Sequence, residues 1–194
     1  TVSPATTSPS GSSGDTDFAK LIADANKAPA RVTYKPSDGA GFTVSQDGHG
    51  KVAYFSDDGD SQIIYDGTNA FVCSSLKSSP SCISETGAAA QATVAGYAAL
   101  LTAAGREIGA ASTAGNPFAD TTDETIAGRD AKCVSYSVAG VGWQACADKE
   151  TGLLLRWKVT GGGTSSSFEA TDYTQPKDSD FTPPATPTAL TPLT

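Results

Sequence analysis

The sequence predicts an α+β domain in which helices lie on one face of an antiparallel sheet. Three observations predict this class. Short stretches of alternating apolar and polar residues follow one another between Asp-Gly turns, two other stretches carry apolar residues at helical spacing, and four cysteines are available for two disulfides. The length of 194 residues fits one domain, which we place at 15–182 between a flexible Ser/Thr/Pro tether at 1–14 and a flexible Pro/Thr tail at 183–194.

The first expected element is a helix that begins near residue 15. Phe18, Leu21, Ile22 and Ala25 fall at i, i+3, i+4 and i+7, so they form one apolar stripe. Pro29 limits how far this helix extends, because proline cannot continue a helix interior.

Alternation with a period of two then predicts a meander of five short strands. Asp-Gly turns separate the strands, and these turns are the strongest short-range sign of hairpins. The alternating residues are Val32 and Tyr34, Phe42 and Val44, Val52 and Tyr54, Ile63 and Tyr65, and Phe71 and Cys73.

The second half repeats the order of helix and strands. An Ala-rich stretch over 88–104 places Val94, Tyr97, Leu100 and Leu101 on one helical face. Four strands follow, at 125–138, 141–148, 152–160 and 165–173, and they form two hairpins.

The first of these hairpins has a register that can be checked. If Ala139 and Gly140 form a two-residue turn, Val138 faces Val141, Tyr136 faces Trp143, Val134 faces Ala145 and Cys133 faces Cys146. This register gathers the large apolar residues on one face and puts both cysteines on the other, on a non-hydrogen-bonded pair that a disulfide can bridge. A bulged turn that uses Gly140 and Gly142 is the alternative.

The four cysteines favour two disulfides, Cys73–Cys82 and Cys133–Cys146, over a metal site. The gaps between them are too wide for the two tight knuckles of a zinc ribbon, and an even number of cysteines is typical of oxidising compartments. No cofactor or metal is therefore expected.

Charge and motifs argue against several function classes. With 13 basic and 21 acidic residues, the chain has no surplus of positive charge with which to bind nucleic acid. His49 is the only histidine and lies in a predicted turn, so a catalytic triad is not expected. Carboxylates such as Asp58, Asp123 and Asp180 lie in predicted turns or strand ends and are interpreted as solvated, so we predict that the protein is not an enzyme.

Several stretches together resemble the LolA/LprG-like lipoprotein-carrier superfamily, particularly secreted actinobacterial members. They are VTYK after the first helix, KVAYF, QIIYDGTNAFVC, Pro80 and Cys82 in a P-x-C pattern, IAGRDAKCVSY, WQACADKETGLLLRW and FEATDYTQPKDSDFTPP. The resemblance implies a strongly curved antiparallel sheet, a half-open β barrel, with helices covering its concave face.

The resemblance also implies an exported, extracytoplasmic protein that binds lipid or lipoprotein acyl chains in a cavity between sheet and helix. A lipid anchor before Thr1 is a hypothesis and would be its one link to a membrane. The expected cavity residues are Phe42, Val44, Val52, Tyr54, Ile63 and Tyr65 from the sheet, and Val94, Tyr97 and Leu101 from the helix. The alternative is an envelope protein-interaction module, a sensor or accessory subunit of a membrane complex, with the same fold and a filled cavity.

Overall fold

A computed structural model describes residues 13–23, 25–87, 90, 92, 120–138 and 140–189. Within them, one antiparallel meander contains β1 (Ala30–Pro36), β2 (Phe42–Gln46), β3 (Val52–Ser56), β4 (Gln62–Tyr65), β5 (Asn69–Ser74) and β6 (Ser81–Thr86). A second contains β7 (Asp120–Ile126), β8 (Arg129–Val138), β9 (Val141–Asp148), β10 (Leu154–Gly161) and β11 (Thr164–Thr174). The other elements are α1 (Ser13–Ala23), η1 (Ala25–Lys27), η2 (Asp178–Phe181) and β12 (Thr188–Ala189).

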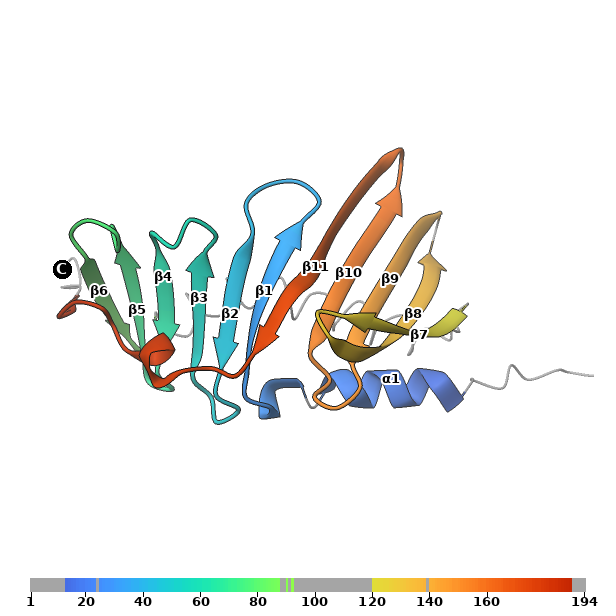
Figure 1. The fold of residues 1–194 in the computed structure, drawn as a ribbon, viewed down its shortest axis with the longest axis horizontal. Coiled ribbons are helices and arrows are strands. Elements are labelled where there is room, and N and C mark those ends of the chain that lie inside the picture. The colour runs from blue at the N-terminus through green and yellow to red at the C-terminus, as the bar shows by residue number, and fades with distance from the viewer. Residues whose placement is uncertain are drawn as a thin grey trace, which may run out of the picture.

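All twelve strands belong to one open sheet (Figure 1). Its order is β12-β6-β5-β4-β3-β2-β1-β11-β10-β9-β8-β7, so β12 and β7 are its two edges. The pairing of β1 with β11 joins the two meanders, and a bulge between Thr33 and Tyr34 shifts its register.

The structure corrects the predicted fold class. We expected an α+β domain, a half-open barrel with helices over its concave face, but the described residues form an open sheet with one α-helix of 11 residues. That helix, α1, lies across the end of the sheet beside the β9–β10 turn instead of over a face (Figure 1). Phe18 is fully buried there, and Leu21 and Ile22 pack on the same core. The predicted apolar stripe of α1 therefore packs against the end of the sheet.

The helix expected over 88–104 lies almost entirely outside the described residues. Strands β6 and β7 were also missed. The polar stretch of β6 has no clear alternation, and the strand expected over 125–138 is interrupted by a turn at Ala127 and Gly128 that separates β7 from β8. Both turn residues have positive φ, 50° and 73°, which matches the right-handed twist of a tight hairpin.

The hairpin register and both disulfides are confirmed. Val138 pairs with Val141, Tyr136 with Trp143, and Cys133 with Cys146, so the two-residue turn holds and the bulged alternative does not. Cys133–Cys146 and Cys73–Cys82 are bonded across neighbouring strands, with Cα atoms 3.9 and 4.1 Å apart.

The last strand, β12, lies within the segment expected to be a flexible tail. Thr188 and Ala189 pair in parallel with Ile83 and Ser84 of β6. Composition alone missed this pairing because Thr188 and Ala189 are exposed and pair through their backbone, so no apolar pattern marks them.

The close approach of α1 to the β9–β10 turn gives a stability prediction. A Cβ on Gly152 would lie 1.8 Å from the Leu21 carbonyl oxygen, and Gly152 has φ +73°. Gly162 has φ +60° with nothing near its Cβ position, so it is a matched control. We expect Gly162→Ala to cost about 1–2 kcal/mol of unfolding free energy from backbone strain, and Gly152→Ala about 3–4 kcal/mol because displacement of α1 is added.

Urea unfolding followed by tryptophan fluorescence measures both values. Equal losses in the two variants would show that α1 does not pack against Gly152 as described.

Candidate functional site

The six sheet residues predicted to line a cavity share one face of the sheet. Val44 pairs with Tyr54, Tyr54 with Ile63, and Val52 with Tyr65. Phe42 alternates with Val44 along β2, and directly paired residues point to the same side. The three helix residues of the same prediction, Val94, Tyr97 and Leu101, lie outside the described residues.

This side of the sheet, called the apolar face below, extends across the β1–β11 junction. Tyr34 stacks on Phe42 with ring centroids 5.1 Å apart and meets Phe168 edge-on at 5.5 Å. Farther along, Trp143 lies between Tyr136 and Trp157, at 6.0 and 5.1 Å. Aromatic side chains therefore follow the apolar face through both meanders.

A small pocket opens at the end of the β3–β4 hairpin. It has a volume of about 240 Å³, and its apolar lining comes from Phe42, Tyr54 and Ile63. Phe55, Ser56, Ser61 and Gln62 complete its wall. Burial raises the pKa of Tyr54 to about 12, so its phenol stays neutral at physiological pH and adds no charge to the pocket.

Two segments of the chain cross part of the opposite face of the sheet. β7 folds over β8–β10, and the C-terminal segment, residues 175–189, passes from β11 along β2–β5 to β6 (Figure 1). Asp180 anchors that segment, because its carboxylate accepts hydrogen bonds from Arg31 at 2.8 Å and Ser45 at 2.7 Å. Its backbone carbonyl accepts another from Gln62 at 2.9 Å.

The interpretation of the turn carboxylates as solvated is therefore wrong for Asp180. Its side chain is only 8% exposed and forms an ion pair with Arg31. Sequence spacing carried no signal for this pair, because its two members lie near opposite ends of the chain.

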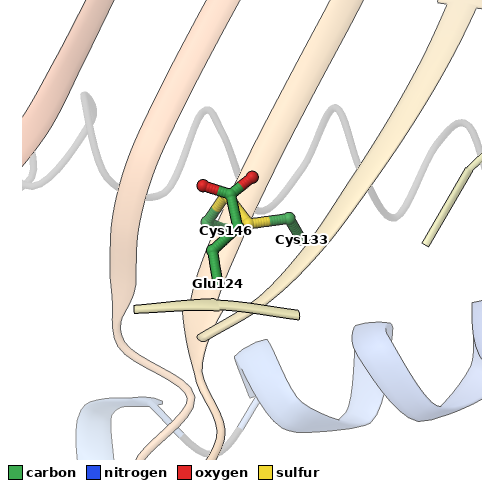
Figure 2. A group of neighbouring side chains, drawn as sticks. All are labelled: Glu124, Cys133 and Cys146. Carbon is green, nitrogen blue, oxygen red and sulfur yellow. A yellow bond between two sulfur atoms is a disulfide. The ribbon is translucent and has the colours of Figure 1, made fainter. Parts of the chain in front are cut away.

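Glu124, Cys133 and Cys146 form the group closest to a metal-site arrangement among the described residues (Figure 2). Both cysteines are consumed by their disulfide and offer no thiolate ligand. The Glu124 carboxylate accepts a hydrogen bond from Arg156 at 2.5 Å. The group therefore holds β7 against the sheet and is not a metal site.

A charged hollow of about 360 Å³ lies beside the β9–β10 turn, between Gly128, Arg129, Asp130, Asp148, Lys149 and Glu150. Arg129 donates to the Asp148 carboxylate at 2.6 Å and to Glu150 at 2.7 Å. Asp148 also accepts from the backbone and hydroxyl of Thr151 at 2.8 and 2.9 Å. The charges at the centre of this hollow are thus already paired, and the network fixes the turn on which α1 packs.

His49 is exposed in its turn, where its Nδ1 lies 3.0 Å from the Asp47 carbonyl oxygen. No nucleophile is bonded to it within the described residues. In that part of the chain, no helix has both the length and the apolar character needed to cross a membrane.

Comparison with known proteins identifies similar folds but no family. No family model matches the sequence, and no curated protein matches it. The structure is similar to that of MucB, with a TM-score of 0.53 and 16% identity over 89% of this chain and 63% of the MucB chain. It is also similar to MucB in the Pseudomonas aeruginosa MucA/MucB complex, with a TM-score of 0.52 and 13% identity over 88% and 61% of the two chains.

The chain thus spans about three fifths of the length of the MucB chains that it matches. At these identities the similarity establishes the fold, which is that of an open antiparallel sheet shared with MucB. A LolA-superfamily protein from Nitrosomonas europaea matches with a TM-score of 0.29 and 11% identity, over 84% of this chain and 96% of the other. A TM-score this low does not establish a shared fold.

The Asp148 network gives a prediction for acid stability. Burial alone would raise the pKa of Asp148, but hydrogen bonds from Arg129 and Thr151 outweigh it and hold the pKa below its ordinary value. Because the pKa is lower in the folded than in the unfolded chain, the stabilisation is complete above the unfolded pKa of about 3.9 and is lost as pH falls through the folded pKa. We expect Asp148→Asn to lose roughly 2–3 kcal/mol at pH 7.

Urea unfolding at pH 7, 5, 4 and 3 measures the difference between wild type and variant, which we expect to shrink below pH 4. Asp38→Asn is the control, because this exposed turn carboxylate accepts a hydrogen bond from the neighbouring Ser37 hydroxyl, and its loss should change stability by less than about 0.5 kcal/mol. A difference that stays constant down to pH 3 would contradict the assignment.

Proposed function

We propose that the protein binds an apolar ligand, lipid or lipoprotein acyl chains, on the apolar face of its sheet. The observation that carries the proposal is the convergence of Phe42, Tyr54 and Ile63 on one uncharged pocket within a larger apolar surface. Apolar pockets with a few polar wall groups are the usual form of small-molecule sites.

The burial of the neighbouring residues supports the same proposal. On the apolar face Tyr34 is 1% exposed, Val44 5% and Ile63 9%, so the pocket lies beside apolar side chains that are shielded from water. The pocket, at about 240 Å³, is smaller than the roughly 300–1,000 Å³ of typical ligand sites. It would hold part of an acyl chain.

We place this function outside the cytoplasm. Two disulfides support that location, because structural disulfides persist in oxidising compartments. We also propose that the protein is an actinobacterial member of the LolA/LprG-like superfamily. It would consist of a single domain at 15–182 and carry a lipid anchor before Thr1.

A second candidate function is binding of an envelope protein, and one observation favours it. The fold resembles that of MucB, which has been solved in complex with MucA. A further structure of MucB in complex with MucA matches this chain with a TM-score of 0.50 and 15% identity. In that case the apolar face would serve as a docking surface or as a filled core. Neither candidate calls for catalysis.

A matched pair of variants tests the apolar ligand. We expect the fluorescent fatty acid 11-(dansylamino)undecanoic acid to bind the native chain with a blue-shifted emission. Tyr54→Lys should weaken binding at least tenfold, because it puts a charge into the pocket. Thr43→Lys places the same charge on the opposite face, beside Thr33, and should leave binding within twofold.

Thermal melts of both variants check that each one folds. Native mass spectrometry of protein from its own host, followed by lipid extraction, then shows whether acyl lipid co-purifies. If the native chain neither carries lipid nor takes up the probe, the carrier proposal fails and the protein-binding candidate takes its place.

A further inference from the structure

The pocket at the β3–β4 hairpin has a buried end and an open end. Ile63 is 9% exposed and forms the buried end, whereas Ser61, beside the turn, is exposed. Ser56 lies at the open end too, because its hydroxyl accepts a hydrogen bond from the Ser61 backbone nitrogen at 3.0 Å. An amphiphile gains most by burying its apolar chain and leaving its polar head in water. Its head group would therefore lie beside Ser56 and Ser61.

A carboxylate lies directly at this open end. Asp58 Oδ1 accepts a hydrogen bond from the Ser56 hydroxyl at 2.5 Å and another from the Asp60 backbone nitrogen at 3.0 Å. These bonds hold the pKa of Asp58 below its ordinary value, so its carboxylate is ionised at neutral pH. Within the described residues both bonds go to one oxygen, and the side chain is exposed, so Oδ2 is available to a ligand.

The surroundings of the open end are acidic. The turns after β1, β3 and β5 lie at the same end of the sheet (Figure 1), and Lys77 is their single basic residue. Lys35, the next cation along β1, points to the opposite face of the sheet, where it pairs with Glu169. The three turns carry four carboxylates, those of Asp38, Asp57, Asp58 and Asp60. A head group at the open end therefore meets a surplus of negative charge.

We propose that the ligand of this pocket is an amphiphile whose head group carries an ammonium, and that Asp58 selects it against amphiphiles with an anionic head group. This inference rests on the proposed function, because it takes the apolar chain of the ligand to lie in the pocket. An ammonium has three hydrogen-bond donors, and Asp58 Oδ2 and the Ser61 hydroxyl are acceptors at the open end. A carboxylate or phosphate head group would instead meet Asp58 as a like charge.

The test compares dodecylammonium with dodecanoate, which share one apolar chain and differ in the sign of the head-group charge. Isothermal titration calorimetry at pH 7 and low salt, below the concentration at which either compound forms micelles, measures both dissociation constants. We expect the native chain to bind dodecylammonium about fivefold to tenfold more tightly, because interactions between exposed charges are modest. This preference should fall towards equal affinity in about 0.5 M sodium chloride, which screens exposed charges.

Three variants locate the source of the preference. Asp58→Asn keeps an oxygen that can accept from Ser56 and Asp60 but loses the charge, so it should reduce the preference about threefold. Lys77→Gln removes the opposing ammonium and should increase the preference. Asp172→Asn is the matched control, because it removes the same charge from an exposed carboxylate of β11 on the opposite face and should leave the preference unchanged. Thermal melts check that each variant folds.

Equal affinity of the native chain for the two amphiphiles, or tighter binding of dodecanoate, would overturn the inference. So would a preference that Asp58→Asn leaves unchanged, that Asp172→Asn reduces equally, or that Lys77→Gln lowers. If neither amphiphile binds at all, the carrier proposal fails and this inference fails with it. If both bind without the expected preference, only the assignment of the head group fails, so the two failures can be told apart.

Discussion

The fold depends on the pairing of β1 with β11, because this is the seam at which two separate meanders become one sheet. Tyr34 secures the seam on the apolar face. It is buried, its hydroxyl donates to the Leu154 carbonyl at 2.8 Å, and its ring packs on Phe42 and Phe168. Arg31 secures it on the opposite face through Asp180. A pairing between distant parts of the chain costs more loop-closure entropy than a hairpin, and these buried contacts offset that cost.

Once the seam is made, the two faces have different roles. Two segments of the same chain cross the opposite face. β7 is held through Glu124 and Arg156, and the C-terminal segment is held through Asp180. Their polar groups are satisfied by charge-assisted hydrogen bonds, which are the stronger kind. The proposed ligand pocket lies on the other face, where Phe42, Tyr54 and Ile63 line it.

Part of the candidate site was predictable because strand periodicity is local. Alternation put Phe42 and Val44 on one side of their strand, and likewise Val52 with Tyr54 and Ile63 with Tyr65. The resemblance placed all six on one face, and the pairings show that they share it. The hairpin register was predictable for the same reason, since its turn and its cysteines are close in sequence. The burial of Asp180 was not, because its partners Arg31 and Ser45 lie far away along the chain and no spacing rule connects them.

The sequence by itself determined where most strands and turns form, how the cysteines pair, and which residues alternate to the same side within each strand. Each of these follows from steric preferences and pairing over a few residues. Only the tertiary structure decided that the two meanders share one open sheet, that α1 packs on a turn rather than over a face, and that the C-terminal segment reaches β6. Those outcomes depend on burial and hydrogen bonding between distant segments, whose net free energy is settled only when the whole core is assembled.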